Sequence, residues 1–259
     1  MDFLQLIIDG MDTFFLVLVR MTALFVIAPF FGRRNIPAYL KVGFAFFSSI
    51  IVLTTVNLNI VEYSNMVEFA LLIAEEFLVG IALGFSVYIM LNAIYVAGQM
   101  IDMQIGFGMV NVINPDSNIQ VPITANFYYI VSILTFLVFR GHHMVIKALY
   151  ESYRFVPIGE AVAGEELLSD IIRLFGNIFV IGFKIAAPIT AAILMANVAL
   201  GVMSKAVPQL NVFVLGMPIK IMLGMIVMLV TMPVFIDMLE ELFSGTAGEM
   251  LNMLEDLGP

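Results

Sequence analysis

Long hydrophobic runs, separated by short polar segments, make up most of the chain. Six of them stand out: residues 13–31, 42–56, 69–97, 123–139, 174–203 and 210–236. A helix needs about 20 residues to cross a hydrocarbon core of about 30 Å, so the first run is near this length, the second and fourth are short, and the others are long. The pattern predicts an all-α integral membrane protein of helical hairpins with about six long hydrophobic helices.

Composition supports this prediction and excludes several classes of function. Of the 259 residues, 62% are hydrophobic and the mean hydropathy is +1.06, which exceeds what a soluble domain normally carries. The net charge of -9, with only 11 Lys and Arg, argues against nucleic acid as a partner. The absence of cysteine removes disulfides and thiolate chemistry. Membrane lipid is therefore one expected neighbour of the chain.

Charges and small residues inside the hydrophobic runs indicate contacts with protein as well as lipid. A charge near the bilayer centre costs about 2.5 to 3.5 kcal/mol even on the lenient insertion scale, and such charges usually face protein or water. Gly80 and Gly84 have the GxxxG spacing that lets helix backbones approach closely. These features predict a subunit of a larger assembly. The charges expected to be buried are Arg20, Glu75, Glu76 and Lys184.

The distribution of basic residues between the runs conflicts with a simple series of membrane crossings. Arg33, Arg34 and Lys41 place the loop after the first run in the cytoplasm by the positive-inside rule. Alternation then puts further bases on the external side: Arg140, Lys147, Arg154 and Arg173. Either the short runs are hairpins that do not fully cross, or protein surrounds them in place of lipid.

No residue pattern supports an enzyme. Motifs for nucleotide hydrolysis, dinucleotide binding, zinc proteases and serine hydrolases are absent from the sequence. His142 and His143 are adjacent, so they point about 100° apart on a helix and cannot close a metal site by themselves. We therefore expect no catalytic residues, no metal and no cofactor. Glu75 and Glu76 leave a proton-coupled carrier as an alternative, although one of them can instead pair with Arg20 or Lys184.

Four motifs, read together, resemble the FliR family of flagellar export-gate proteins. They are "PFFGRRNIP" (29–37), "GFGMVNVINPDSN" (106–118), "GHHMVIKALYESYRFVPIG" (141–159) and "PQLNVFVLGMPIK" (208–220). The resemblance covers nearly the whole chain, and the injectisome counterpart from virulence type III secretion is the near alternative. It implies a FliP-like part at about 1–170 fused to a FliQ-like part at about 171–240, followed by an acidic tail at 241–259.

The resemblance also implies a role and partners. The family member is a single copy that forms, with FliP and FliQ family subunits, the export gate for unfolded flagellar proteins in the inner membrane, within the flagellar basal body. An FlhB-like export protein is a further implied partner. In the family, the loop that matches the second motif helps to plug the pore, which gives the plug candidates Gly106, Phe107, Gly108, Met109, Val110 and Asn111.

The last motif predicts a buried corner of a helical hairpin. We expect Pro208 and Pro218 to break helices there, and polar side chains to bond with neighbouring subunits or with the FlhB-like partner. The alternative is a plain loop with a capping amide. The residues expected in this assembly contact are Pro208, Gln209, Asn211, Gly216, Pro218 and Lys220.

Overall fold

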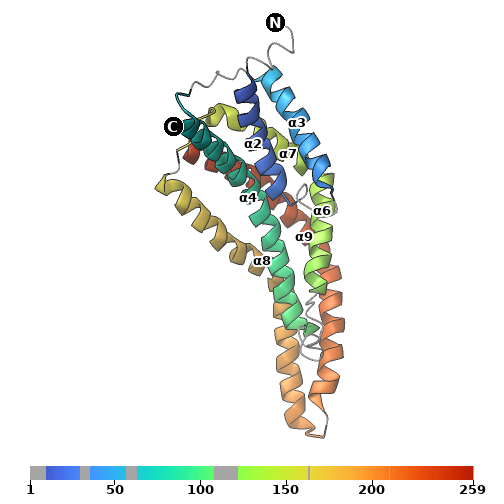
Figure 1. Ribbon diagram of the computed structural model, residues 1–259. Helices are drawn as coiled ribbons and strands as arrows, with labels where there is room; N and C mark the ends of the chain where they lie inside the picture. The colour runs from blue at the N-terminus through green and yellow to red at the C-terminus, as the bar shows by residue number, and fades with distance from the viewer. Residues whose placement is uncertain are drawn as a thin grey trace, which may run out of the picture. The chain divides into compact units, whose positions relative to one another are not determined.

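The computed structural model describes residues 10–29, 36–56, 63–107, 122–162, 164–209 and 211–258. These residues are helical apart from turns and short connections, and the described part of the chain contains no strand. The helices, labelled in Figure 1, are α2 (Met11–Ile27), α3 (Ala38–Thr55), α4 (Met66–Ile105), α6 (Ile123–Val138), α7 (Gly141–Phe155), α8 (Glu165–Ala206) and α9 (Val212–Leu257).

The all-α membrane fold is confirmed, but the count of about six long membrane helices is not. Within the described residues, four helices are long and apolar enough to cross a membrane, or up to five if the bent pair of α6 and α7 forms one span. The described part of each hydrophobic run lies mainly in a helix. However, α2 and α6 have only 17 and 16 residues, whereas α4, α8 and α9 have 40, 42 and 46. Polar residues at the ends of the runs continue the helices, so hydropathy alone did not give their lengths.

Prolines inside the long helices do not end them. Pro188 lies within α8, and Pro218 and Pro233 lie within α9. The expectation that Pro218 breaks a helix is wrong, and only Pro208 stands in the turn between α8 and α9. Membrane helices tolerate proline because neighbouring groups and small local adjustments satisfy the carbonyl that loses its donor.

The chain forms two compact units whose residues interleave along the sequence. The first, unit 1, comprises residues 1–90, 140–174 and 243–259. Its core includes one face of α2, where Leu16, Val17 and Leu24 are fully buried. Phe14 and Phe25 make edge-to-face contacts with Phe46 and Phe44 of α3, at centroid distances of 5.4 and 5.1 Å. These contacts fix α3 beside α2, as Figure 1 shows.

The acidic tail belongs to unit 1 from residue 243 onward. Residues 241–257 are the last turns of α9, with Phe243, Met250 and Met253 buried. Ser86 of α4 donates a hydrogen bond to the Met253 sulfur over 2.9 Å. Exposed Arg173 of α8 pairs with Glu249 at 2.9 Å. One side of this acidic helix is therefore packed within unit 1.

Unit 2 comprises residues 91–139 and 175–242. Its parts of α8 and α9 run antiparallel and are joined by a short turn (Figure 1). Tyr128 of α6 packs edge-to-face against Phe235 of α9, with ring centroids 4.4 Å apart. The division at about residue 170 into FliP-like and FliQ-like parts stays a prediction.

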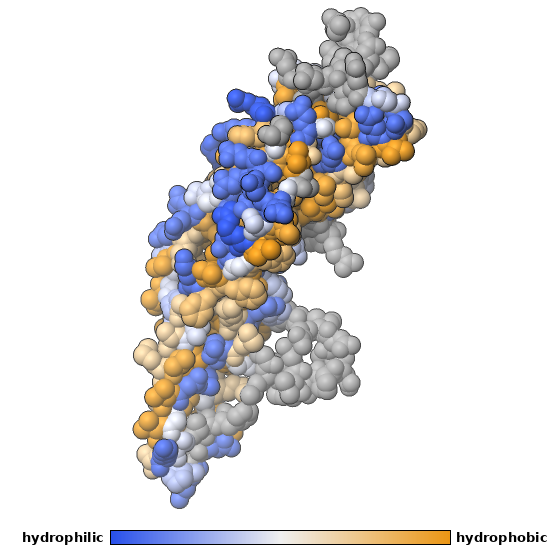
Figure 2. Space-filling model, turned by 90° about the vertical axis from the view of Figure 1, so that its left-hand side faces the viewer, coloured by the Kyte–Doolittle hydropathy of each residue, from blue (hydrophilic) through white to orange (hydrophobic). Residues whose placement is uncertain are grey.

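Much of the apolar surface of the chain is exposed. Within the most apolar 18-residue window of each helix, 67% of α4 is buried, but only 17% of α3 and 11% of α9. Figure 2 shows hydrophobic side chains over much of the face it displays. Exposed apolar area of this extent is typical of surfaces covered by lipid or by other proteins.

Candidate functional site

A buried ion pair lies at the centre of unit 1. Arg20 of α2 meets Glu76 of α4, with Nε 2.7 Å from Oε2 and Nη2 2.9 Å from Oε1. Both side chains are 0% exposed. This two-point contact matches the planar fork of the guanidinium to the carboxylate, the strongest geometry available to such a pair.

The remaining donors of Arg20 bind α7 and the turn that follows it. Nη1 donates to Ser152 Oγ, and both Nη1 and Nη2 donate to the carbonyl oxygen of Val156, each over 3.1 Å. The guanidinium carbon also lies 4.3 Å from the centre of the Tyr153 ring, in cation–π contact. One arginine therefore joins α2, α4 and α7, and its charge is both paired and hydrogen-bonded.

The other two charges expected to be buried are placed differently. Glu75 is only partly buried, and its Oε2 atom has no hydrogen-bond partner among the described residues. Lys184 is exposed on α8, as are Val180 and Pro188 one turn away on either side. The described chain does not bury Lys184, because that face of α8 is not packed by the rest of unit 2.

Gly80 and Gly84 are used inside the chain. A Cβ atom at Gly80 would clash with the carbonyl oxygen of Arg20, and one at Gly84 would lie 3.1 Å from Ile27 Cβ. Both glycines are buried against α2, so the close approach they permit joins α4 to α2 of the same molecule. The expectation of an intersubunit contact at these two positions is replaced by this intramolecular one.

The plug candidates follow directly from α4. Gly106 has φ +101°, a conformation that favours glycine, and turns the chain out of the helix before half-buried Phe107. Gly108, Met109, Val110 and Asn111 lie outside the described residues.

Asp102 ties the two sides of this connection together. Its carboxylate accepts hydrogen bonds from the backbone N–H groups of Thr124 (3.0 Å) and Ala125 (3.3 Å), in the first turn of α6. One turn earlier on α4, a Cβ atom at Gly98 would lie 2.6 Å from the nitrogen of Ala125. The end of α4 and the start of α6 are thus held in direct backbone contact.

Sequence reasoning missed both Gly98 and Asp102. A capping acid is normally sought just before its helix, but Asp102 precedes the helix it caps by about 20 residues. The one available signal was an acid in the last turn of an apolar helix, where it opposes the helix dipole and therefore needs another partner.

The turn between α8 and α9 contains the remaining predicted residues. Pro208 and Gln209 are exposed, and Asn211 caps α9, with its Oδ1 3.4 Å from the backbone nitrogen of Val214. A Cβ atom at Gly216 would lie 3.2 Å from Leu200 Cδ1. Lys220 is half-buried and Pro218 is exposed. The amide of Asn211 therefore has a local capping role in the isolated chain.

Histidine and acid groups do not gather into a metal site in the described residues. The rings of His142 and His143 lie 4.3 Å apart at the start of α7.

Comparisons with known proteins decide the family. The model of "Bacterial export proteins, family 1" matches residues 11–246. The chain belongs to this family. Its relatives in the family include three proteins named flagellar biosynthetic protein FliR. The one from Bacillus subtilis (strain 168) is 37% identical over 97% of this chain and 98% of its own length.

The other two relatives with the same name have lower identity to this chain. The protein from Escherichia coli (strain K12) is 30% identical over 96% of this chain and 94% of its own. The one from Aquifex aeolicus (strain VF5) is 29% identical over 79% of each. The resemblance to the FliR family is thereby confirmed, and the helices of this export protein make it a multi-pass membrane protein.

Proposed function

We propose that the chain is a non-enzymatic subunit of the flagellar type III protein export gate, through which unfolded flagellar subunits leave the cell. It acts in the bacterial inner membrane, within the basal body. The observation that carries this proposal is the full-length similarity to the Bacillus subtilis protein named flagellar biosynthetic protein FliR.

The partners belong to the same proposal. The chain forms a hetero-oligomer, as a single copy, with subunits of the FliP and FliQ families and contacts an FlhB-like export protein. The exposed apolar faces of α8 and α9 support it, since only 33% and 11% of their most apolar windows are buried within the chain itself. Exposed Lys184 supports it as well, because a charge at bilayer depth needs a protein or water neighbour.

The segment after α4 acts as a plug in this proposal. Gly106, Phe107 and residues 108–111 form the constriction that excludes ions and yields to a passing chain. Asp102 supports the idea, because it fixes both sides of the connection through α6.

The turn between α8 and α9 is the second proposed contact. Exposed Gln209 in the turn and half-buried Lys220 of α9 offer hydrogen bonds to a sibling subunit or to the FlhB-like protein, and Pro208 stands in the turn itself. Asn211 is already used for capping, so Gln209 is the sharper test. Replacement of Gln209 by Ala should reduce recovery of the complex and leave the isolated chain folded.

Affinity purification from the native membrane in mild detergent, followed by mass spectrometry of the intact assembly, tests the proposal. Recovery of this chain in one copy with several copies of two smaller membrane proteins supports it, and recovery from the native membrane without any partner protein contradicts it. Deletion of the gene should also abolish secretion of hook and filament proteins, with restoration by a plasmid copy. Loss of virulence effectors with intact flagellar secretion would instead assign the chain to an injectisome.

A proton-coupled carrier has less support from the structure. Glu76 is fully engaged by Arg20, so its carboxylate already has a fixed counter-ion. Substrate-dependent proton uptake by the purified chain in liposomes would revive that alternative.

A further inference from the structure

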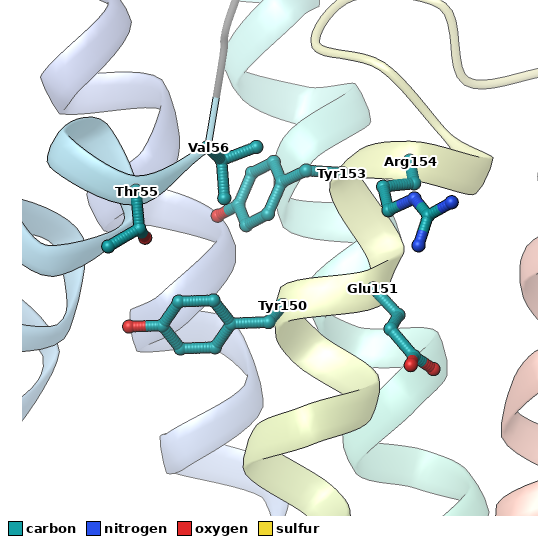
Figure 3. Close-up of a pocket in the computed structure, with 6 residues that line it drawn as sticks. All are labelled: Thr55, Val56, Tyr150, Glu151, Tyr153 and Arg154. Atoms are coloured by element: carbon teal, nitrogen blue, oxygen red, sulfur yellow. The ribbon is translucent and has the colours of Figure 1, made fainter.

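A concavity in unit 1 lies between the end of α3 and the second half of α7. It measures about 590 Å³ and is lined by Thr55, Val56, Tyr150, Glu151, Tyr153 and Arg154. Figure 3 shows Tyr150 and Tyr153 pointing from α7 toward Thr55 and Val56, while Glu151 and Arg154 extend from the other edge of α7. The concavity therefore has an aromatic side and a charged side.

Its position relative to α3 points to lipid. α3 is a candidate membrane span that ends at Thr55, and only 17% of it is buried. Exposed Phe44, Phe47 and Ile51 continue its apolar surface toward this end. Because the end of a hydrophobic span lies at the level of the lipid headgroups, the concavity lies where headgroups meet acyl chains.

The charges on α7 favour a negatively charged headgroup. Exposed basic side chains follow one face of the helix from its N-cap: Arg140, Lys147 and Arg154. Glu151 on the same face is 3.6 Å from Lys147, so its charge is compensated. Among the described residues, no ion pair or hydrogen bond engages the Arg154 side chain. In a chain of net charge -9, this face is locally basic.

We propose that this concavity binds the headgroup of an anionic phospholipid. The Arg154 guanidinium binds the phosphate, since its planar fork matches two phosphate oxygens. The Tyr150 ring and hydroxyl lie at the boundary between headgroup and acyl chains, as interfacial tyrosines do. The acyl chains lie along the exposed face of α3. This binding also gives a reason for Arg154, one of the bases that broke the positive-inside pattern, because a bound lipid phosphate would be its counter-ion.

Native mass spectrometry of the full-length chain in mild detergent tests the proposal. We would titrate phosphatidylglycerol, phosphatidylcholine with the same acyl chains, and diacylglycerol, which lacks the phosphate. We expect phosphatidylglycerol to bind most tightly. Arg154→Gln should raise its dissociation constant about tenfold, as expected for the loss of one charge-assisted contact. Arg154→Lys and Tyr150→Phe should each raise it by about two- to threefold.

Arg173→Gln is the matched control. Arg173 is also an exposed arginine of unit 1, but it is bound to Glu249 and Asp170 at 2.9 and 3.1 Å. Its replacement should leave lipid binding unchanged. Circular dichroism and size-exclusion chromatography of every variant establish that the fold is retained, and Arg154 is exposed, so its replacement disturbs no core contact.

Four outcomes would overturn the proposal. These are equal binding of phosphatidylglycerol and phosphatidylcholine, unchanged binding in Arg154→Gln, an equal loss in Arg173→Gln, and displacement of the lipid by millimolar inorganic phosphate alone. Binding of a hexaglutamate peptide at Arg154 without binding of phosphatidylglycerol would assign the concavity to an acidic protein partner. The readout is lipid binding by the purified chain, so the result does not depend on the export role.

Discussion

The two compact units hold their helices together in different ways. In unit 1, a fully buried Arg20–Glu76 pair joins three helices. In the described residues of unit 2 no such ion pair occurs, and close backbone contact, which unit 1 also has at Gly80 against Arg20, joins the helices without one, as at Gly98 against Ala125. The single buried acid there, Asp102, serves as a helix cap.

This difference shows two solutions to one problem. In lipid, apolar side chains gain little free energy by contacting each other in place of acyl chains. Helices therefore associate through close packing and polar contacts. Unit 1 combines the close packing of α4 on α2 with directional bonds that join α2, α4 and α7. Unit 2 relies on close packing at small residues such as Gly98, where the backbones of two helices come into direct contact. The two solutions predict different responses to substitution.

The largest effect is expected where unit 1 loses one half of its ion pair. Arg20→Met leaves Glu76 buried without its counter-ion and leaves the Val156 carbonyl without its donors. Breaking a buried pair in this way costs about 3–5 kcal/mol of the free energy of unfolding. Thermal unfolding of a fluorescent fusion, followed by size-exclusion chromatography, should show a large loss of folded protein. Glu76→Gln should be nearly as damaging.

Controls separate the ion pair from the general effect of a change in α4. Glu75→Gln alters the adjacent, partly exposed acid and should cost under about 1 kcal/mol. The double variant Arg20→Met with Glu76→Leu should recover part of the loss, because no unpaired charge remains. Full stability of Arg20→Met alone would show that close packing holds unit 1 together without the ion pair.

Next in size is a change that tests packing in unit 2. Gly98→Ala places a methyl group against the backbone of Ala125, which cannot move aside as a flexible side chain can. Overpacking of this kind costs about 1–3 kcal/mol. Thermal unfolding of the purified variant should show the loss. An unchanged melting temperature would mean that α4 and α6 can separate without cost, and that close contact does not stabilise unit 2.

The sequence predicted the positions of the helices well, because the described part of each hydrophobic run lies mainly in one helix. It also offered a pairing of Glu75 or Glu76 with Arg20 or Lys184, and the structure shows Arg20 with Glu76. The sequence could not choose Glu76, since the choice depends on which acid of α4 faces α2. Nor could it show that Gly80 and Gly84 face the same α2, because GxxxG spacing identifies a smooth helix face and not its neighbour.

Contacts between distant residues were the least predictable part of the candidate site. Asp102 caps a helix that begins about 20 residues later. The helix α7 was not among the predicted hydrophobic helices, because polar residues between its apolar ones leave no continuous hydrophobic run. The concavity beside it depends on the end of α3, nearly 100 residues before Tyr150. Such sites arise from packing that no local pattern encodes.

A smaller effect is expected at the cap that joins α4 to α6. Asp102→Ala removes the acceptor for two backbone N–H groups and should cost about 1–2 kcal/mol. If the connection between these helices is the plug, the variant should also leak ions when the assembled gate is expressed, measured as growth inhibition or dye uptake. Gln99→Ala, at an exposed position one turn earlier, should do neither. Equal leakage in both variants would show that the ion leak does not depend on the helix cap at Asp102.

The smallest expected effect is an increase in the free energy of unfolding, not a loss. Gly176 lies on α8, and outside its own stretch of helix no described atom lies within 4 Å of the place where a Cβ would stand. Gly176→Ala should therefore stabilise the isolated chain by about 0.5–1 kcal/mol, because alanine favours the helix and meets no obstacle. Thermal unfolding beside Gly98→Ala tests this directly, since both are Gly→Ala changes within helices of unit 2. A loss at Gly176 as large as that at Gly98 would show that packing does not distinguish the two glycines. A gain in the isolated chain, combined with weaker recovery of the assembled complex, would place a neighbouring subunit against this face of α8.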